Sequence, residues 1–456
     1  MTQTFNSIIM ITKYSGGLYM PKIVLIGVGS YVFGRDIISD IMLYPALKGS
    51  TLSLMDIDKE RLDLFTAYAK KLIQQQKADL KIESTTDRRE ALDGADYVIV
   101  SIRSGGWPVH NKNRDITMKR GLEIQSDAMG VGGVFSGLRH IPDILDICHD
   151  MEEVCPDAWL LNYSNPMAMI CWAINDYSKV KNVGLCPNPT GQSERFGTMA
   201  GVPAKDVWYT VGGLNHQSWL LEIKYQGEDL YPRLREMIDK IKISDEHESS
   251  PGTESAVEVE MFKTFGYFST GFGHLTISLP YFRRKPQLLE KYKLGDQARE
   301  YVIPLIEKQA EDLRNDLKSG KIFDLGEHRY TVIAVSVINA METGNQIRIF
   351  GNVKNTGLIP NLLEGCVVEV PCMIDKGGVH PTYIGNLPAQ CAALNRLNIN
   401  VQEMAVRGIV EKDKQKVLQS LLLDPLTFSM LSIDEIKEMV DELFKVEIKK
   451  FIKGYK

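Results

Sequence analysis

The sequence predicts an α/β protein built on a doubly wound parallel sheet. Short, continuously apolar segments, such as residues 23–26 and 51–55, have the length and composition of strands that are buried on both faces. Segments with apolar residues at helical spacing alternate with these strands through the first part of the chain. Alternation of this kind produces parallel strands that helices cover on both sides.

The expected elements follow one another in chain order. Strands are expected at residues 22–26, 51–55, 81–84, 97–102, 159–162 and 182–185, and helices within 31–45 and at 61–77, 88–92, 141–154 and 166–177. After about Pro189 the pattern changes to longer helices, for example 288–317 and 401–423, mixed with β-type segments at 219–225 and 367–373. We therefore expect an N-terminal extension at 1–20, a nucleotide-binding domain at 21–195 and a second, α+β domain at 196–456. The cleft between the two domains is the expected ligand site.

Composition excludes several classes of protein. The 456 residues include 44% hydrophobic and 24% charged side chains, as in ordinary soluble domains, and the net charge of −5 argues against nucleic-acid binding. No apolar stretch is long enough to span a membrane, and the first twenty residues lack the features of a secretory signal. The seven cysteines form no CxxC pair, which favours reduced thiols. A cytoplasmic protein is expected.

A glycine-containing turn follows the first strand and precedes a helix. Small residues in such a turn let backbone amides approach a pyrophosphate at the N-terminus of the helix, as in Rossmann-like domains. The third glycine of the GxGxxG pattern is missing, because residue 32 is Val and the next glycine is Gly34. Asp56 ends the second strand, where a carboxylate accepts hydrogen bonds from a ribose, and this favours NAD over NADP. The residues expected at the cofactor are Gly27, Gly29, Ser30, Tyr31 and Asp56. The alternative is a domain that binds another nucleotide or none.

Further polar residues follow later strands. The segment NYSNPMA at 162–168 lies between a strand and a helix, Cys186 follows the next strand, and Asn215 and His216 follow a Gly-Gly turn. Residues at the carboxyl ends of parallel strands converge on the cofactor. Each of these side chains also has a structural interpretation. Cys186 and His216 occur more often in cores than as ligands when they stand alone, and Asn165 is a suitable cap for the helix that Pro166 begins.

Together these residues resemble the NAD- and divalent-metal-dependent family 4 glycoside hydrolases, over residues 21 to about 405. The resemblance also rests on SIRSGG at 101–106, GVGG at 130–133, LRHIP at 138–142, GLNH at 213–216, FGYF at 265–268 and VEVPC at 368–372. It implies a Rossmann-like domain followed by an α+β domain for substrate and metal, as in lactate and malate dehydrogenases. It further implies NAD, a divalent cation such as Mn²⁺, a small glycoside substrate and a homodimer or homotetramer.

The resemblance assigns roles to individual residues. Cys186 and His216 would hold the cation, Tyr267 would act as the catalytic base, and Asn162 would lie at the cofactor. The substrate would contact Asn165, Arg103, Arg139 and Arg283. A purely structural aromatic anchor is the alternative role for Tyr267.

The chemistry of the family explains these residue types. Oxidation of the sugar 3-hydroxyl by NAD⁺ acidifies the proton at C2, and a base then removes it while a cation stabilises the negative charge. Elimination expels the group at C1, water adds, and the hydride returns, so that the cofactor is regenerated. Family 4 enzymes are exceptions to the usual scheme with two carboxylates.

One position departs from the family pattern. Relatives carry His, Asn or Asp after the cysteine, whereas this chain has Pro187, which neither donates a proton nor binds metal. Asn188 is the candidate to replace that residue. The substrate is therefore open: a neutral α-galactoside or α-glucoside, or an anionic hexoside such as a uronide or a sulfoquinovoside, for which the basic residues would provide partners. A 2-hydroxyacid dehydrogenase and a non-catalytic NAD-binding module are the alternatives outside the family.

Overall fold

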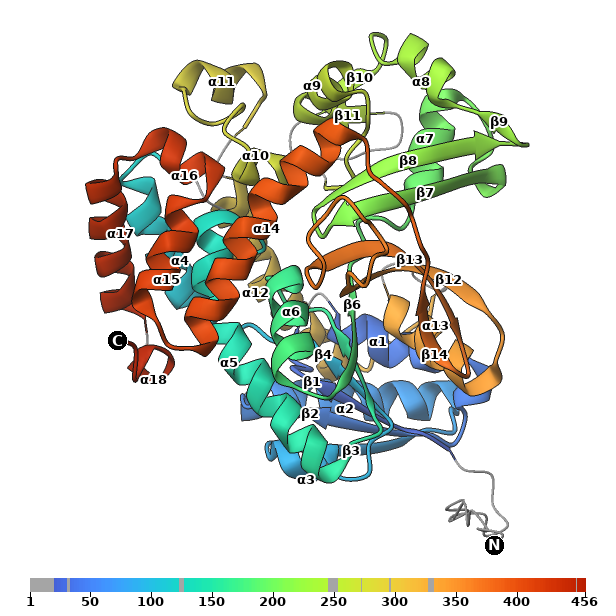
Figure 1. Ribbon diagram of the computed structural model, residues 1–456. Coiled ribbons are helices and arrows are strands. Elements are labelled where there is room, and N and C mark those ends of the chain that lie inside the picture. The colour runs from blue at the N-terminus through green and yellow to red at the C-terminus, as the bar shows by residue number, and fades with distance from the viewer. Residues whose placement is uncertain are drawn as a thin grey trace, which may run out of the picture.

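The computed structural model describes residues 20–456 except 31–32, 123–126, 245–252, 272, 295–296, 327–331 and 448. The cofactor residue Tyr31 and all but the last residue of the expected N-terminal extension lie outside the described residues. Most of the chain surrounds one twelve-stranded sheet (Figure 1). The sheet has a parallel half and an antiparallel half.

The parallel half confirms the predicted doubly wound arrangement. Its strands are β1 (Lys22–Ile26), β2 (Thr51–Met55), β3 (Lys81–Thr85), β4 (Tyr97–Val100), β5 (Trp159–Asn162) and β6 (Lys181–Leu185). They lie in the order β3-β2-β1-β4-β5-β6, and every neighbouring pair is parallel. The chain winds first toward β3 and then from β1 toward β6. Loops at the carboxyl ends of these strands therefore meet along one edge of the sheet.

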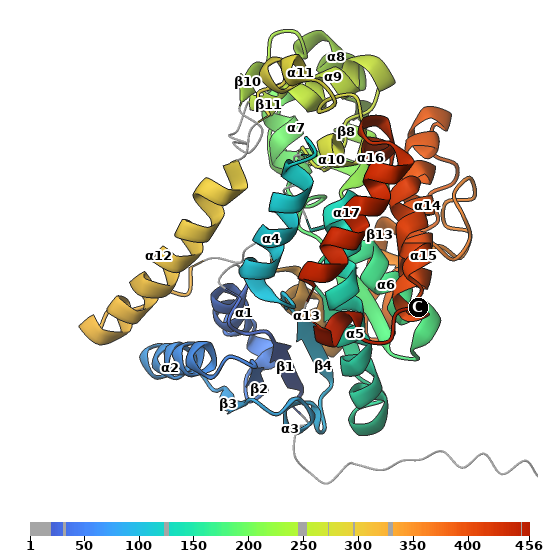
Figure 2. The same ribbon diagram turned by 90° about the vertical axis from the view of Figure 1, so that its left-hand side faces the viewer.

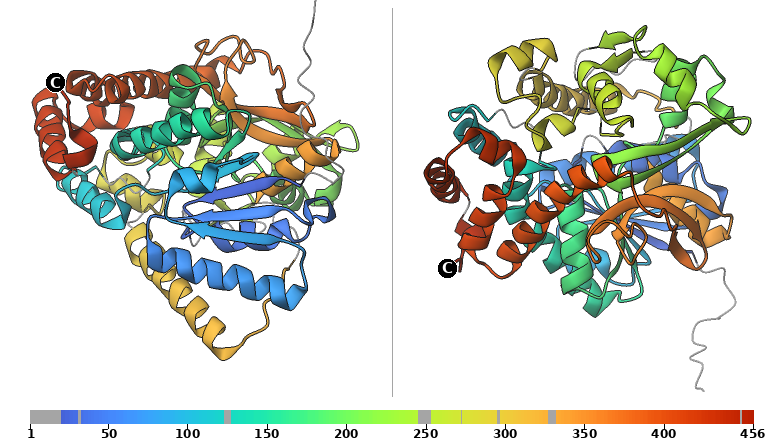
Figure 3. Two further views of the ribbon diagram at one scale, coloured as in Figure 1. Left: turned by 90° about the horizontal axis from the view of Figure 1, so that it is seen from below. Right: turned by 45° about the horizontal axis from the view of Figure 1, so that its top comes forward.

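The antiparallel half continues the same sheet. Its strands are β7 (Val207–Leu214), β8 (Gln217–Tyr225), β9 (Glu228–Asp229), β12 (Ile347–Lys354), β13 (Val367–Asp375) and β14 (Gly378–Pro381). Strand β12 pairs antiparallel with β6, where Gly351 lies opposite Leu185, and β13 joins β12 to β7. Figure 3 shows β12 and β13 leading from the parallel strands toward the β7–β8 hairpin. A small parallel pair, β10 (Lys242–Ser244) and β11 (Thr253–Ser255), lies apart from this sheet.

Helices cover both faces of the sheet. Those of the first half are α1 (Gly34–Ile41), α2 (Lys59–Gln76), α3 (Arg88–Leu92), α4 (Gly106–Met118), α5 (Gly130–Val154), α6 (Met167–Tyr177) and α7 (Gln192–Ala200). Those of the second half are α8 (Tyr231–Met237), α9 (Ala256–Phe265), α10 (Leu275–Ser278), α11 (Pro286–Lys291), α12 (Gln297–Ser319), α13 (Ile333–Thr343), α14 (Ala389–Val410), α15 (Lys414–Leu422), α16 (Pro425–Met430), α17 (Ile433–Val446) and α18 (Lys449–Ile452). Helix α1 contacts both α2 and α13, and α5, α6 and α14 form a second group.

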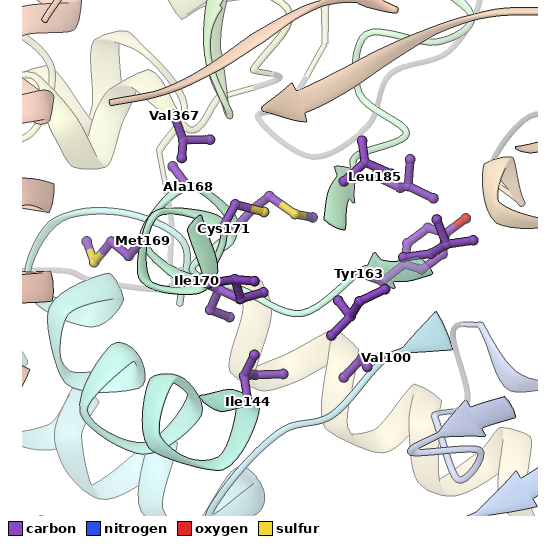
Figure 4. Packing of buried hydrophobic residues seen from close by; sticks show 14 of the residues in the cluster. Val100, Ile144, Tyr163, Ala168, Met169, Ile170, Cys171, Leu185 and Val367 are labelled. Atoms are coloured by element: carbon purple, nitrogen blue, oxygen red, sulfur yellow. The ribbon is translucent and has the colours of Figure 1, made fainter. Parts of the chain in front are cut away.

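The main core extends over both faces of the sheet, and one part of it lies between the parallel strands and the second helix group. Figure 4 shows Val100 of β4 and Leu185 of β6 close to Ile144 of α5 and Ile170 of α6. All four side chains are almost completely buried. Because α6 is apolar on nearly its whole surface, it packs between the sheet and both α5 and α14.

Three helix predictions were wrong in extent. The helix predicted at 288–317 is divided into α11 and α12, and Lys293 between them has a left-handed backbone with φ of 53°. The helix predicted at 401–423 is divided into α14 and α15, because Lys412 is left-handed and the Asp413 side chain caps a new helix. Helix α5 begins at Gly130 rather than at residue 141, and it continues through Pro142. Within the described part of the chain, no helix has the length and apolar character needed to cross a bilayer.

Candidate active site

The glycine turn after β1 has the geometry of a cradle for phosphate groups. Gly27 has φ of 85°, and a Cβ atom there would lie 2.3 Å from the Ser101 carbonyl oxygen. Ser30 donates its backbone N–H to the Gly27 carbonyl at 3.0 Å and accepts from the Gly34 N–H at 2.7 Å, so the turn leads directly into α1. Only glycine fits at residue 27, because the backbone is left-handed and the neighbouring loop is in contact. The turn fits a pyrophosphate.

Asp56 closes this cradle from the end of β2. Its Oδ2 accepts the Gly29 N–H at 2.8 Å, and its Oδ1 accepts the Asp58 N–H at 2.9 Å. A Cβ at residue 29 would lie 2.7 Å from Asp56 Oδ2. Asp56 therefore contacts the glycine turn, and it is also the residue predicted to accept hydrogen bonds from the ribose.

Asn162, also predicted at the cofactor, orders a loop at the end of β5 in this structure. Its side chain is completely buried; its Nδ2 donates to the Ser164 carbonyl and its Oδ1 accepts from the Ser164 N–H, both at 3.0 Å. Ser164 Oγ in turn accepts the Ile102 N–H at 2.9 Å, which joins two neighbouring strand-end loops. Asn162 thus orders the loop that presents Asn165.

Cys186 follows β6 and is buried. Burial, reinforced by the charge of Glu369, raises the pKa of its thiol, while hydrogen bonds from the Asn188 backbone and the Asn215 side chain act in the opposite direction. Asn215 is the residue before His216. The Cys186 and His216 segments are thus in contact through Asn215, although they are far apart in the sequence.

His216 lies in the turn between β7 and β8 with a left-handed backbone, φ of 60°. Its ring is buried, and Nδ1 has no hydrogen-bond partner among the described residues. The ring of His274 lies against it with centroids 4.1 Å apart. Burial and the neighbouring His274 lower the pKa of His216, whereas the nearby Asp127 carboxylate opposes this change.

These features fit a divalent cation. A neutral imidazole with an unsatisfied nitrogen and a thiol that can lose its proton are both ligands for borderline metals. Within the described part of the chain, no group of three or more His, Cys, Asp or Glu side chains has the geometry of a complete site. The protein would therefore supply a partial ligand set and leave positions for substrate oxygens.

Tyr267 lies in a segment that follows α9 and pairs with β8. Leu220 donates its N–H to the Phe268 carbonyl at 2.9 Å, and Thr270 donates to the Ser218 carbonyl at 3.0 Å. The half-buried Tyr267 ring lies edge-on to the ring of Tyr231, with the ring centroids 5.8 Å apart. The same segment continues to Gly271, where a Cβ would lie 2.3 Å from the His216 carbonyl oxygen. The segment of the predicted base thus runs alongside the turn that carries His216.

Asn165 is half-buried at the start of α6, and its Oδ1 accepts the Met167 N–H at 3.3 Å. The helix begins at Met167 with Pro166 at the N-cap position, so Asn165 lies one residue before the predicted cap and still accepts the first N–H of α6. The Asn188 backbone faces the Cys186 thiol, and its carbonyl accepts from Gln192 Nε2 at 2.6 Å.

The predicted substrate arginines are all engaged by protein groups. Arg103 Nη1 lies 2.7 Å from Asp127 Oδ2, and its guanidinium stacks on Trp107. Arg139 Nη1 lies 2.6 Å from Glu447 Oε1. Arg283 is buried, and its Nε donates to Thr276 Oγ1 at 3.1 Å.

Sequence reasoning missed several residues of this site. They are His110, Asp127, His140, His274 and Glu369. The Asp127 carboxylate acts on His216, and the Arg103 guanidinium together with His110 and His140 holds the pKa of Asp127 below its ordinary value despite burial. Glu369 belongs to the VEVPC segment, which was noted only as a family marker. A carboxylate in the middle of an apolar strand needs polar partners when it is buried, so the position of Glu369 was a signal that polar groups gather there.

Comparisons with known proteins agree with this geometry. A sequence profile described as "Family 4 glycosyl hydrolase" matches residues 22–202, and the profile of the family's C-terminal domain matches residues 211–427. An α-galactosidase of Bacillus subtilis strain 168 is 37% identical over 431 residues, which cover 93% of this chain and 98% of that protein.

Solved structures show the same fold. A 6-phospho-α-glucosidase from gut microorganisms, solved in complex with NAD and Mn²⁺, superposes with a TM-score of 0.80 at 22% identity and covers 95% of this chain and 98% of its own. The malate dehydrogenase of Plasmodium falciparum superposes with a TM-score of 0.50 at 14% identity, covering 88% and 100%. The predicted dehydrogenase-like fold is confirmed. With both family domains matched along most of its length, the chain belongs to the family 4 glycosyl hydrolases.

Proposed function

We propose that this chain is an α-galactosidase that acts on a neutral α-galactoside and requires NAD⁺ and a divalent cation such as Mn²⁺. The observation that carries the proposal is the 37% identity with the Bacillus subtilis α-galactosidase over 93% of the chain. The cofactor requirement is supported by the glycine turn with Asp56, by the buried Cys186 thiol and by the unsatisfied Nδ1 of His216.

The residues of the chain divide the work of binding and proton transfer. When bound, NAD⁺ accepts and returns a hydride at sugar C3, and the cation polarises the neighbouring sugar oxygens. The turn at Gly27 and Gly29 would hold the pyrophosphate, and Cys186 with His216 would hold the cation. Asn165 is the proposed contact for sugar hydroxyls. Tyr267 is the proposed base that removes the C2 proton, because its segment lies beside the His216 turn.

The chain has no evident proton donor for the group that leaves from C1. Pro187 has no proton to donate, and the Asn188 amide donates hydrogen bonds but does not ionise. We therefore expect activated aryl galactosides to be hydrolysed faster than alkyl galactosides. The Asn188 side chain would assist by a hydrogen bond rather than by full proton transfer.

A neutral sugar is favoured over a uronide or a sulfoquinovoside by the pairing of the basic residues. Arg103 and Arg139 each already have a carboxylate partner, and Lys119 and Arg120 both lie within ion-pair distance of Glu442. An anionic substrate at Arg103 or Arg139 would have to replace the carboxylate that already pairs with that guanidinium.

The test is a panel of p-nitrophenyl glycosides in reducing buffer with NAD⁺ and Mn²⁺, compared with the same panel after removal of either cofactor. The expected result is release of nitrophenol from the α-galactoside that needs both cofactors and leaves no lasting NADH. Lasting NADH with a 2-hydroxy acid and no nitrophenol release would instead identify a dehydrogenase. Activity that survives exhaustive chelation would contradict the proposal.

A further inference from the structure

A carboxylate from the C-terminal segment enters the basic side of the site. Glu447 directly follows α17, which packs beside α4 (Figure 2). Only 3% of Glu447 is exposed. Its Oε1 accepts hydrogen bonds from Arg139 Nη1 at 2.6 Å and from Asn113 Nδ2 at 2.7 Å.

Arg139 is fixed by protein groups around its guanidinium. Its Nε donates to the Ser104 carbonyl at 3.0 Å, and Nη1 also donates to the Phe135 carbonyl at 3.1 Å. Burial lowers the pKa of Arg139 and raises the pKa of Glu447, and each charge opposes the shift of the other. A buried guanidinium needs an anion beside it, since an uncompensated charge in this environment is strongly destabilising. In this chain Glu447 is that anion.

The space next to this pair is small and basic. Arg139, Arg114 and His110 line a cavity of about 20 Å³ together with Asn113 and apolar groups. A volume of this size accommodates about one water molecule. It is too small for a sulfonate or a phosphate group, and two of its lining residues, Asn113 and Arg139, are the hydrogen-bond partners of Glu447.

The cavity adjoins the loop that follows β4, because Arg139 lines the cavity and its Nε donates to the Ser104 carbonyl at 3.0 Å. The start of this loop lies against the glycine turn, since a Cβ at Gly27 would lie 2.3 Å from the Ser101 carbonyl oxygen. The residue before Ser104, Arg103, pairs with Asp127 at 2.7 Å. A substrate anion that reached Arg139 would therefore lie against the loop that borders the proposed cofactor site.

We propose that Glu447 determines the charge class of the substrate: its carboxylate takes the place at Arg139 that a substrate anion would occupy, so the site accepts an uncharged sugar and rejects an anionic one. This inference rests on the proposed glycosidase function and adds a residue that selects its substrate. The matched family domains end at residue 427, so α17 and Glu447 lie outside them.

The experiment uses the full-length protein and four variants. Glu447→Ala removes the carboxylate that contacts Arg139 and Asn113, Glu447→Gln removes only its charge, and Glu447→Ala with Arg139→Ala removes both charges. Glu442→Ala is the matched control, because Glu442 lies within α17 but pairs with Lys119 and Arg120, which follow α4. Calorimetry measures binding of inorganic phosphate and sulfate with NAD⁺ at saturation and without Mn²⁺, so that the pyrophosphate and metal sites do not contribute. Rates are measured with p-nitrophenyl α-galactoside and p-nitrophenyl α-galacturonide.

The expected result is saturable anion binding by Glu447→Ala alone, absent from the unaltered protein, the control and the double variant. The ratio of galacturonide to galactoside activity should rise by about tenfold or more in Glu447→Ala, because a charge-assisted hydrogen bond of ordinary strength is gained. If Glu447→Ala is unfolded, recovery of its fold by added acetate or phosphate supports the inference equally.

Other outcomes overturn it. A folded Glu447→Ala variant that binds no anion, or anion binding that persists when Arg139 is also replaced, contradicts a selecting role for Glu447. Loss of folding that no anion restores, in Glu447→Ala and in Glu447→Gln, would mean that the pair is only structural. Failure of the glycosidase function is distinguishable, because the unaltered protein would then hydrolyse neither glycoside while the anion measurements still report on Arg139.

Discussion

Glu369 Oε1 accepts a hydrogen bond from Asn215 Nδ2 at 3.2 Å, and the same Asn215 side chain hydrogen-bonds to the Cys186 thiol. Glu369 is fully buried on β13 and also accepts from Ser218 and Asn352, at 2.6 and 3.0 Å. The Glu369 carboxylate on β13 is therefore hydrogen-bonded both to β12 and to the β7–β8 hairpin that carries His216. Partners of this kind orient the ligands of metal sites in other proteins.

The first prediction concerns stability and pH. Burial raises the pKa of Glu369 to about 7, above the ordinary value of 4.5. The folded metal-free protein therefore binds the proton more tightly than the unfolded chain does. Tighter binding of this proton by the folded protein adds about 3 kcal/mol to the free energy of unfolding. The added stability is complete below about pH 4.5 and is lost as the pH rises through about 7.

Glu369→Gln should remove this contribution while it preserves the shape of the side chain. Urea denaturation of the metal-free protein between about pH 4.5 and pH 8 measures it as the difference between the two proteins. The exposed Glu364→Gln serves as the control. Parallel pH profiles for the unaltered protein and Glu369→Gln would contradict the assignment.

The second prediction concerns the metal ligands. Cys186→Ala and His216→Ala should each weaken binding of Mn²⁺ by more than about 100-fold, since loss of a ligand costs more than loss of a residue that only orients one. Cys171→Ala, which removes a buried thiol from α6, should bind Mn²⁺ normally. Electron paramagnetic resonance of free Mn²⁺ gives the affinities. Unchanged affinity in Cys186→Ala would exclude the thiol as a ligand.

The third prediction concerns proton release. Burial raises the pKa of Cys186 and lowers the pKa of His216, so at neutral pH the metal-free site holds a thiol and a neutral imidazole. The thiol must lose its proton when the cation binds. Mn²⁺ affinity should therefore increase about tenfold for each unit of pH around neutrality, with release of about one proton. Calorimetry in buffers of different ionisation enthalpy counts that proton, and an affinity independent of pH would be inconsistent with thiolate ligation.

The fourth prediction concerns the cofactor. Asp56→Ala should weaken NAD⁺ binding by about tenfold or more, because the glycine turn loses the acceptor for the Gly29 N–H and the ribose loses a charged partner. Asp63→Asn, which alters an exposed pair with Lys59 on α2, is the control and should bind NAD⁺ normally. Fluorescence titration measures both. Equal affinity in Asp56→Ala and in the control would remove Asp56 from the cofactor site.

The parallel half of the fold was predictable because its strands are local and strongly apolar. Segments 22–26, 51–55 and 159–162 were expected as strands and are β1, β2 and β5 with the same or nearly the same ends. The continuation of the sheet through β12 and β13 was not predictable, since it depends on pairing between residues as distant as Leu185 and Gly351. The division of α14 from α15 depends on the left-handed Lys412, a feature that amphipathic spacing does not reveal.

The site was predictable where a motif supplied both residue type and spacing. The glycine turn and the Cys186 and His216 segments lie as expected, and their roles remain predictions. The acidic partners were not predictable. Asp127 and Glu447 are separated by long stretches of chain from the arginines that they neutralise, and a single sequence shows no sign of those pairs. The sequence therefore leaves anionic sugars open, and the proposal of a neutral sugar depends on these pairs.

Hydrolysis of p-nitrophenyl α-galactoside labelled with deuterium at C2 gives the most direct test of oxidation followed by elimination. If Tyr267 removes the C2 proton during each turnover, the galactose produced in H₂O should contain hydrogen at C2, and Tyr267→Phe should slow its formation by about 100-fold or more relative to Tyr281→Phe. Galactose that retains its deuterium in the unaltered enzyme would contradict removal of the C2 proton and with it the proposed mechanism.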